Sequence, residues 1–193
     1  MNKSRIRNIR KEVLSDNWYT LYKYTYEYQK DDGDWETQIR ESYDRGNGAA
    51  ILLYNKQKGT VILTKQFRMP TYVNGNPSGM MIEVCAGLLD GADPKECIIK
   101  EVEEETGYKI HHVKKVFESY MSPGAVTEIL HFFIGEYEEQ MKVGEGGGAA
   151  DESENIEVLE VFSDKALEMI RNGEIKDAKT IMLLQYASLN NII

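Results

Sequence analysis

The segment Gly87–Tyr108, GLLDGADPKECIIKEVEEETGY, carries more closely spaced carboxylates than a stable helix requires. Asp93 is a favourable N-cap residue, and Pro94 suits the first helical position. Glu96 completes a pattern similar to a capping box. Gly107 is favourable just after the last helical residue. The segment therefore predicts a loop followed by a helix that begins at Pro94 and ends before Gly107.

Three glutamates of this predicted helix share one face. Glu105 lies four positions after Glu101, and Glu104 lies three positions after it. At about 100° per residue, the three side chains fall within about 100° of one another. Like charges at this spacing repel by about 0.2–0.5 kcal/mol per pair. A divalent cation would remove that cost, and hard oxygen ligands suit Mg²⁺ or Mn²⁺. The alternative is a solvated, glutamate-rich helix face.

Length, charge and cysteine content limit the class of protein. A chain of 193 residues is long enough for one domain with a substantial core. Its net charge of −9 argues against non-specific nucleic-acid binding, which needs a basic surface. No apolar run approaches the roughly 18 residues of a membrane-spanning helix, and no apolar signal region follows the basic N-terminus. Cys85 and Cys97 suggest no disulfide framework. We therefore expect a soluble, cytoplasmic protein with no nucleic-acid or membrane partner.

Alternating patterns on both sides of the segment predict strands. Residues 17–29 and 35–45 flank a turn at Asp31–Asp34 and predict an N-terminal β-hairpin. Further strands are expected over 49–54, 60–68, 80–86, 113–120, 128–137 and 156–162.

The remaining stretches predict helices and loops. Ser163 is expected to cap a helix over 164–172, and a second helix is expected over 178–189. Residues 71–79 and 121–125 are expected to be loops. The glycine-rich stretch 138–155 is expected to be a long mobile loop, since long loops inside domains are usually functional or disordered.

The helical segment resembles the Nudix box. That signature is a glycine, an acid, and then Arg-Glu-apolar-x-Glu-Glu-x-Gly-apolar. Gly87, Asp93 and the run Lys100–Tyr108 (KEVEEETGY) follow this pattern. Lys100 replaces the box arginine, Asp93 replaces the usual glutamate, and the interval between them is one residue shorter than the general spacing.

Other stretches resemble the GDP-mannose pyrophosphatase branch of the Nudix hydrolase family, which lies close to the ADP-ribose pyrophosphatases. They are 15–17 (SDN), 43–48 (YDRGNG), 66–68 (QFR), 85–90 (CAGLLD) and 121–124 (MSPG). That branch shares the shortened box and the lysine at position 100. The resemblance implies an α/β/α sandwich with a mixed sheet over 46–193. It also implies that the N-terminal segment, 1–45, is exchanged between the subunits of a homodimer.

The resemblance further implies an activity. Enzymes of this branch use Mg²⁺ to split a GDP-sugar, so the expected reaction converts GDP-mannose to GMP and mannose 1-phosphate, with Mn²⁺ as a possible substitute. ADP-ribose or another nucleoside diphosphate sugar is an alternative substrate. A nucleotide-binding domain without catalysis is the alternative outside enzymes.

The same resemblance implies roles for individual residues. The metal ligands would be the Ala86 carbonyl, Glu101, Glu105 and Glu154. Glu154 would also be the general base, with Glu152 as its reserve and Glu104 as a further catalytic candidate. Substrate contacts would come from Arg68, Ala86, Gly87, Leu88, Glu128, Ser153 and Lys179. The partner subunit would supply Trp18, Arg40 and Glu41, with Trp18 stacking on the base.

Overall fold

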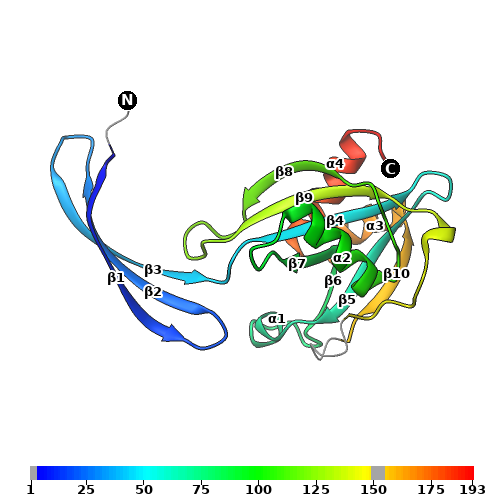
Figure 1. The fold of residues 1–193 in the computed structure, drawn as a ribbon, viewed down its shortest axis with the longest axis horizontal. Coiled ribbons are helices and arrows are strands. Elements are labelled where there is room, and N and C mark those ends of the chain that lie inside the picture. Colours follow the sequence, from blue (N-terminus) through cyan, green and yellow to red (C-terminus); the bar gives the residue numbers. More distant parts are fainter. Residues whose placement is uncertain (1–3, 149–154) are drawn as a thin grey trace. The chain divides into compact units, whose positions relative to one another are not determined.

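The chain divides into two compact units. A computed structural model describes residues 4–148 and 155–193. Unit 1 comprises Met1–Asn47 and Tyr120–Ile129, and unit 2 comprises Gly48–Ser119 and Leu130–Ile193. Figure 1 shows the elements of both units.

Unit 1 contains a three-stranded antiparallel sheet in the order β1-β2-β3, formed by β1 (Ile6–Asp16), β2 (Thr20–Gln29) and β3 (Trp35–Asp44). β2 and β3 form a hairpin around the predicted turn, where Gly33 adopts a φ of +93°. β1 extends this hairpin to three strands, so the prediction of a two-stranded segment is wrong in the number of strands. Residues 17–19, predicted as strand, lie between β1 and β2.

Unit 2 is organised around a seven-stranded mixed sheet. Its main path runs β10-β5-β4-β9-β8, with β6 paired to β5 and β7 paired to β4. β4 and β9 are parallel, whereas β4 is antiparallel to β5 and to β7. The strands are β4 (Gly48–Asn55), β5 (Thr60–Phe67), β6 (Met80–Glu83), β7 (Cys85–Leu88), β8 (Lys114–Tyr120), β9 (Ile129–Glu136) and β10 (Glu157–Phe162).

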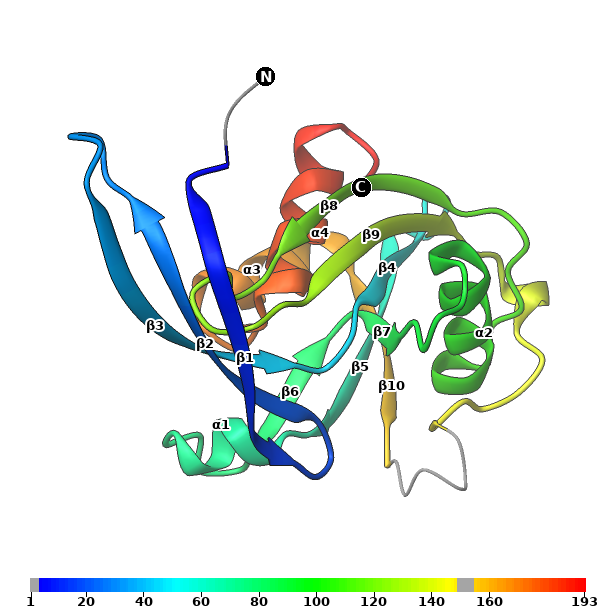
Figure 2. The ribbon, with the colours of Figure 1, turned by 60° about the vertical axis from the view of Figure 1, so that its left-hand side comes forward.

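Helices lie on both faces of this sheet. α2 (Pro94–Thr106) covers one face, over β4 and β7, and α3 (Ser163–Arg171) and α4 (Ala178–Leu189) cover the other (Figure 2). The α/β fold with a mixed sheet is therefore as predicted. Two short helices, α1 (Met69–Val73) and η1 (Glu139–Met141), lie in connections. None of the helices in the described part of the chain has the length and apolar character needed to cross a membrane.

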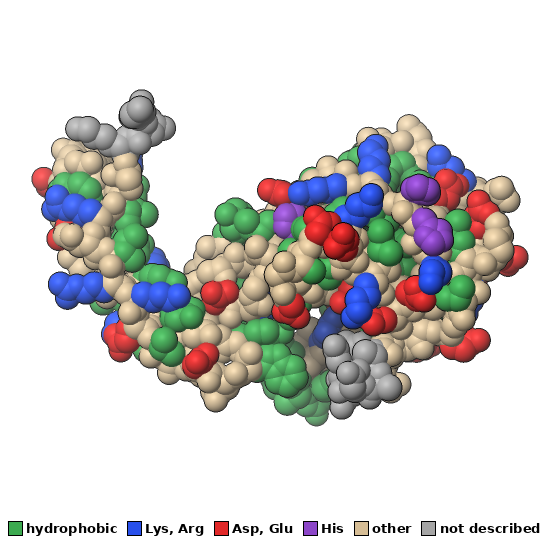
Figure 3. All heavy atoms as spheres, viewed as in Figure 1, with side chains coloured by type: hydrophobic (Ala, Val, Ile, Leu, Met, Phe, Trp, Pro, Cys, Tyr) green, Lys and Arg blue, Asp and Glu red, His purple; other side chains and the backbone are tan. Residues whose placement is uncertain are grey.

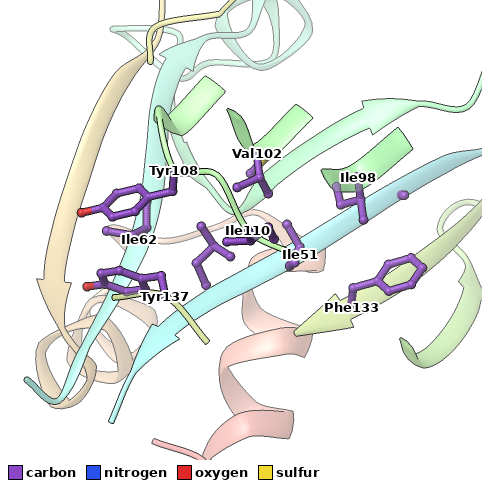
Figure 4. Close-up of a cluster of buried hydrophobic side chains, with 11 residues drawn as sticks. Ile51, Ile62, Ile98, Val102, Tyr108, Ile110, Phe133 and Tyr137 are labelled. Atoms are coloured by element: carbon purple, nitrogen blue, oxygen red, sulfur yellow. The ribbon is translucent and has the colours of Figure 1, made fainter. Parts of the chain in front are cut away.

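The main core lies between α2 and the sheet. Ile98 and Val102 of α2 belong to the same buried cluster as Ile51 of β4 and Phe133 of β9 (Figure 4). Fully burying an aliphatic side chain of this size contributes about 1.5–3 kcal/mol. Because β4 is covered on both faces, its sequence is a continuous apolar run rather than an alternating one. This packing fixes the carboxylate face of α2 relative to β7.

Three local predictions are corrected by the structure. The expected strand over 80–86 is two strands, since the chain changes sheet partner at Val84. The expected loop over 71–79 begins inside α1. Ser163 does not cap α3: it is the first helical residue, and its backbone N–H donates to the Gly59 carbonyl at 2.8 Å.

The segment that was expected to form a long mobile loop is bonded over 138–148 to α2 and to the residues that follow it. Tyr108 and Lys142 form an isolated β-bridge. Gly147 N–H donates to the Glu105 carbonyl at 2.9 Å, and Gly148 N–H donates to the Glu104 carbonyl at 3.2 Å. These bonds satisfy carbonyl groups at the C-terminal end of α2, which lack partners within the helix. The mobility of 138–155 stays a prediction, and residues 149–154 lie outside the described part.

Candidate active site

The boundaries of α2 follow from local side-chain chemistry. The Asp93 carboxylate accepts hydrogen bonds from the backbone N–H groups of Lys95 at 2.9 Å and Glu96 at 3.2 Å. Gly107 adopts the left-handed conformation, with a φ of +74°, and its N–H donates to the Glu103 carbonyl. Both caps are where the sequence predicts them, so the three glutamates have the expected helical spacing.

These three glutamates have different environments. Glu105 is buried, whereas Glu101 and Glu104 are half-buried. Glu104 forms an ion pair with Lys100, at 3.1 Å. Burial raises the pKa of the Cys85 thiol well above its ordinary value, and the charge and hydrogen bond of Glu105 raise it further. The Cys85 thiol therefore stays protonated beside the Glu105 carboxylate.

Close packing joins this face of α2 to the backbone of β7. The Glu101 side chain lies directly against Gly87, where any Cβ would overlap it. Ala86, next to Gly87, is paired with Ala50 of β4. Among the described strands, β7 pairs only with β4. The Leu88 carbonyl of β7 accepts from Cys97 Sγ of α2 at 3.2 Å, a second contact between the two elements.

Two cations of unit 2 are linked through one buried acid. Arg68 donates to the Glu83 carboxylate from Nε at 2.7 Å and from Nη2 at 3.2 Å. Lys179 Nζ bonds to the same carboxylate and also to Asp177, at 2.9 Å. Burial lowers the pKa of Arg68, but the Glu83 hydrogen bond and charge outweigh it and raise the pKa, with smaller contributions from Glu105 and Asp177. Glu83 therefore holds Arg68 and Lys179 together in unit 2.

Figure 3 shows acidic and basic side chains beside one another on the face of unit 2 that carries α2. The predicted residues of unit 2 form two groups. On α2 and β7 lie Glu101, Glu104, Glu105, Ala86, Gly87 and Leu88, and Arg68 and Lys179 are bonded to Glu83 at the end of β6. Three further predicted residues, Glu152, Ser153 and Glu154, lie outside the described residues.

The predicted residues of unit 1 are described within that unit. Trp18 is 86% exposed and contacts the ring of Tyr19 edge-on. Arg40 donates to Gln38 and to the Ile39 carbonyl, and Glu41 lies opposite Lys23 in the β2–β3 register.

Glu128, the fourth predicted residue of unit 1, lies in the 120–129 segment. Its carboxylate is 3.6 Å from Arg45 Nε, and the Arg45 guanidinium in turn lies 5.5 Å from the ring centroid of Tyr19. The ion-pair partner of Glu128 thus lies within the same unit.

The oxygen ligands predicted for the metal suit a hard divalent cation, but not all of them lie in the described part of the chain. Within 4–148 and 155–193, no group of three or more His, Cys, Asp or Glu side chains is arranged to hold a metal ion. Glu101 and Glu105 supply carboxylate oxygens next to the Ala86–Gly87 backbone, which is the chemistry that Mg²⁺ prefers. The fourth predicted ligand, Glu154, lies outside the described residues. The residues present therefore fit the cation by donor type.

Sequence reasoning missed Glu83, Asp177 and Thr180. Glu83 is the one acid in the otherwise apolar run from Met80 to Leu88, and a buried acid requires a partner. Asp177 precedes Thr180 by three residues, which is N-cap spacing. Both signals are in the sequence, but neither identifies the partners of Glu83.

Comparison with known proteins gives consistent matches along the chain. Residues 5–43 match the family model described as the GDP-mannose pyrophosphatase NudK N-terminal domain, and residues 44–184 match the NUDIX domain. A GDP-mannose pyrophosphatase of Yersinia enterocolitica is 58% identical over 189 residues, 98% of both chains. One of Pectobacterium atrosepticum is 58% identical over 93% of this chain and 92% of its own. One of Yersinia pseudotuberculosis is 56% identical over 96% and 93%. Together with the capped carboxylate helix, these matches show that the chain belongs to the Nudix family of hydrolases.

Proposed function

We propose that this protein is a GDP-mannose pyrophosphatase that uses Mg²⁺. Water adds to one phosphorus of the diphosphate, the bridging P–O bond breaks, and the products are GMP, mannose 1-phosphate and the protons released. The observation that carries the proposal is the contact of the Glu101 side chain with Gly87 in β7, near the Arg68–Glu83–Lys179 cluster. The substrate is taken from the names of the relatives, which are 56–58% identical to this chain.

Hydrolysis of a diphosphate requires compensation of its negative charge and activation of a water molecule. Glu101, Glu105, Glu154 and the Ala86 carbonyl would hold the metal. When bound, Mg²⁺ neutralises phosphate charge and lowers the pKa of coordinated water. The glutamates would orient the diphosphate indirectly, because they would determine the position of the bound cation.

Arg68 and Lys179 would contact phosphate oxygens directly. A guanidinium offers five N–H donors, and Glu83 uses Nε and Nη2. The N–H groups of Arg68 that point away from Glu83 can bind a phosphate oxygen, while Nε and Nη2 stay bonded to Glu83. The Gly87 and Leu88 backbone and Ser153 would complete the phosphate and sugar contacts. Glu154 is the proposed general base, with Glu152 and Glu104 as alternatives.

We also propose a homodimer in which unit 1 of one subunit completes the site of the other. The β1 strand is exposed along nearly its whole length, and Ile9, Val13 and Ile39 are more than half exposed. A small sheet with such a surface is stabilised by packing against something else. In this proposal Trp18, Arg40 and Glu41 of one subunit contact the nucleotide in the site of the other, with Trp18 stacking on the base. Glu128 is a proposed substrate contact together with Arg68 and Lys179. A cytoplasmic location is part of the proposal, in keeping with two free cysteines.

A substrate panel tests the proposed activity. GDP-mannose, ADP-ribose and other nucleoside diphosphate sugars are incubated with the protein and Mg²⁺, and the products are resolved by ³¹P NMR. We expect GDP-mannose to have the highest kcat/KM and to give GMP and mannose 1-phosphate. Faster cleavage of ADP-ribose would overturn the proposed substrate and leave the hydrolase activity standing. Binding without cleavage of any compound would overturn the enzymatic proposal. The variant Glu105→Gln serves as the control for a contaminating activity.

A further inference from the structure

Glu83 is a buried acid in the apolar strand β6. It is 3% exposed, and both of its carboxylate oxygens bond to cations, Oε1 to Arg68 and Oε2 to Arg68 and Lys179. An ionised carboxylate that is removed from water is costly unless it is paired and hydrogen-bonded. Glu83 meets this condition through side chains that come from two other parts of unit 2.

The two cations belong to elements that are far apart in sequence. Arg68 directly follows β5, and Lys179 lies in the first turn of α4. The start of α4 is itself fixed to the residue that follows Glu83, because Val84 N–H donates to Thr180 Oγ1 at 2.8 Å. Thr180 is fully buried. This bond keeps the first turn of α4 beside the end of β6.

Asp177 completes the arrangement. Its Oδ2 accepts from the Thr180 N–H at 2.9 Å and from Thr180 Oγ1 at 2.6 Å, and its Oδ1 accepts from Lys179 at 2.9 Å. Two acids and two cations therefore form one hydrogen-bonded cluster. Burial raises the pKa of Glu83, but the charges and hydrogen bonds of Lys179 and Arg68 outweigh it and leave the pKa below its ordinary value. Glu83 is ionised at neutral pH.

The exposure of these groups separates their roles. The Glu83 side chain is 4% exposed, whereas the side chains of Arg68 and Lys179 are 42% and 14% exposed. A substrate can therefore reach Arg68, while Glu83 lies beneath it. A free arginine or lysine side chain has many rotamers, and part of this freedom is lost when it binds a ligand. A buried acid that fixes both cations beforehand removes part of that cost.

We infer that Glu83 is a positioning residue, which holds Arg68 and Lys179 as one preorganised phosphate-binding pair and fixes α4 to the catalytic face of the sheet. This inference rests on the proposed function, since the pair is taken to contact the diphosphate. Glu83 itself does not touch substrate. It acts by directing Arg68 and Lys179 toward the negative charge that develops on the leaving phosphate as the bridging P–O bond breaks.

The first test is a double-mutant cycle on kcat and KM with Glu83→Gln, Lys179→Met and the combined variant. Glu83→Gln is expected to lower kcat by about 10- to 100-fold, the scale of a misplacement of about 1 Å. KM is expected to change little, because removing the acid also removes negative charge near the diphosphate. In the combined variant, kcat/KM should fall by clearly less than the product of the two single factors, because both changes disrupt one unit. Unchanged kcat in Glu83→Gln, or factors that multiply, would overturn the inference.

A matched control removes an acid from a different lysine cluster. Glu160 bonds to Lys58 at 3.1 Å and accepts from Tyr137 at 2.8 Å, so Glu160→Gln also breaks a lysine–hydroxyl network of unit 2. We expect it to keep wild-type kcat and KM. If Glu160→Gln lowers kcat as much as Glu83→Gln does, the effect of Glu83→Gln is general destabilisation of unit 2, and the inference is overturned. If Glu83→Gln does not fold, Glu83→Asp replaces it in the cycle, since aspartate keeps the charge and cannot reach both cations.

The second test requires no substrate. In protein labelled with ¹⁵N-arginine, the Nε–H signal of Arg68 is identified by its loss in Arg68→Lys. We expect slow exchange of this proton with water in the wild type and fast exchange in Glu83→Gln. An unchanged exchange rate would overturn the positioning role. If the exchange behaves as expected but the wild type cleaves no nucleotide sugar, the proposed function is overturned while the positioning of Arg68 by Glu83 stands.

Discussion

The Glu101 side chain occupies the space that a side chain at position 87 would need. A Cβ built on Gly87 would lie 2.5 Å from Glu101 Cγ and closer still to its carboxyl group, whereas carbon atoms in favourable contact are about 3.5–4.0 Å apart. Gly87 does not have a positive φ. A side chain at position 87 would therefore have to displace the Glu101 side chain, and the reason is the close approach of α2 to β7 and not a turn.

This contact predicts that Gly87→Ala inactivates the enzyme. The added methyl group must displace Glu101, and a shift of about 1 Å at a catalytic group costs about 100-fold in rate. We expect kcat/KM to fall by at least about that factor, with a higher Mg²⁺ concentration needed for half-maximal rate. The control is Gly144→Ala, because an added Cβ there meets nothing within 4 Å and Gly144 has no positive φ. Equal activity of the two variants would show that the contact has no role in catalysis.

A second prediction concerns the charge of Glu105. Glu105→Gln keeps the size of the side chain and removes its charge, so kcat should fall by orders of magnitude if the glutamate holds a metal. The control is Glu103→Gln on the same helix, since Glu103 is exposed and its ion pair with Lys109 spans 3.6 Å. Rates are measured across a Mg²⁺ titration. An active Glu105→Gln enzyme with normal metal dependence would contradict the assignment.

Acid should remove the stabilisation that Glu83 provides. The pKa of Glu83 in the folded protein lies below its ordinary value of 4.5, so the folded state favours the ionised form. A group of this kind stabilises the fold above its unfolded pKa, and this contribution is lost as pH falls through the folded pKa. The difference in unfolding free energy between wild type and Glu83→Gln should therefore be constant from about pH 6 to 8 and shrink below about pH 4.5. Urea unfolding at fixed protein concentration measures it, and a difference that grows in acid would contradict the prediction.

The sequence was most informative where local chemistry determines the structure. Asp93 and Gly107 define both ends of α2, because an N-cap carboxylate and a left-handed glycine act within one helical turn. The predicted helix over 178–189 agrees with α4, and the structure adds that Asp177 caps its start. The spacing of Glu101 and Glu105 then placed both on one face without any tertiary information.

Other features depend on contacts that no local pattern reveals. β1 was missed because register shifts between Arg7 and Arg10 and between Val13 and Ser15 interrupt its alternation. α1 is five residues long, which is too short to show a helical period. The partners of Glu83 are 15 and 96 positions away in sequence, so only the folded sheet identifies them.

The last prediction is that each active site is shared between two subunits. It is motivated by Trp18, which is 86% exposed, and by Arg40, whose guanidinium donates to its sequence neighbours, the Gln38 side chain and the Ile39 carbonyl. The competing hypothesis is a monomer in which each chain builds its own site. Neither Glu105→Gln nor Arg40→Ala should be active alone if both residues serve the same site.

Mixing the two inactive variants separates these hypotheses. In a hybrid dimer, one site combines the intact Glu105 of one subunit with the intact Arg40 of the other, and the second site lacks both. After complete exchange of equal amounts, half of the dimers are hybrids with one intact site of two, so about a quarter of wild-type activity should return. Exchange is confirmed by mass spectrometry of a tagged subunit. A mixture of wild type and Glu105→Gln shows how much activity remains when an active chain is mixed with an inactive one. The absence of any hybrid would support the monomer. Complete exchange without recovered activity would show that each subunit of a dimer builds its site alone.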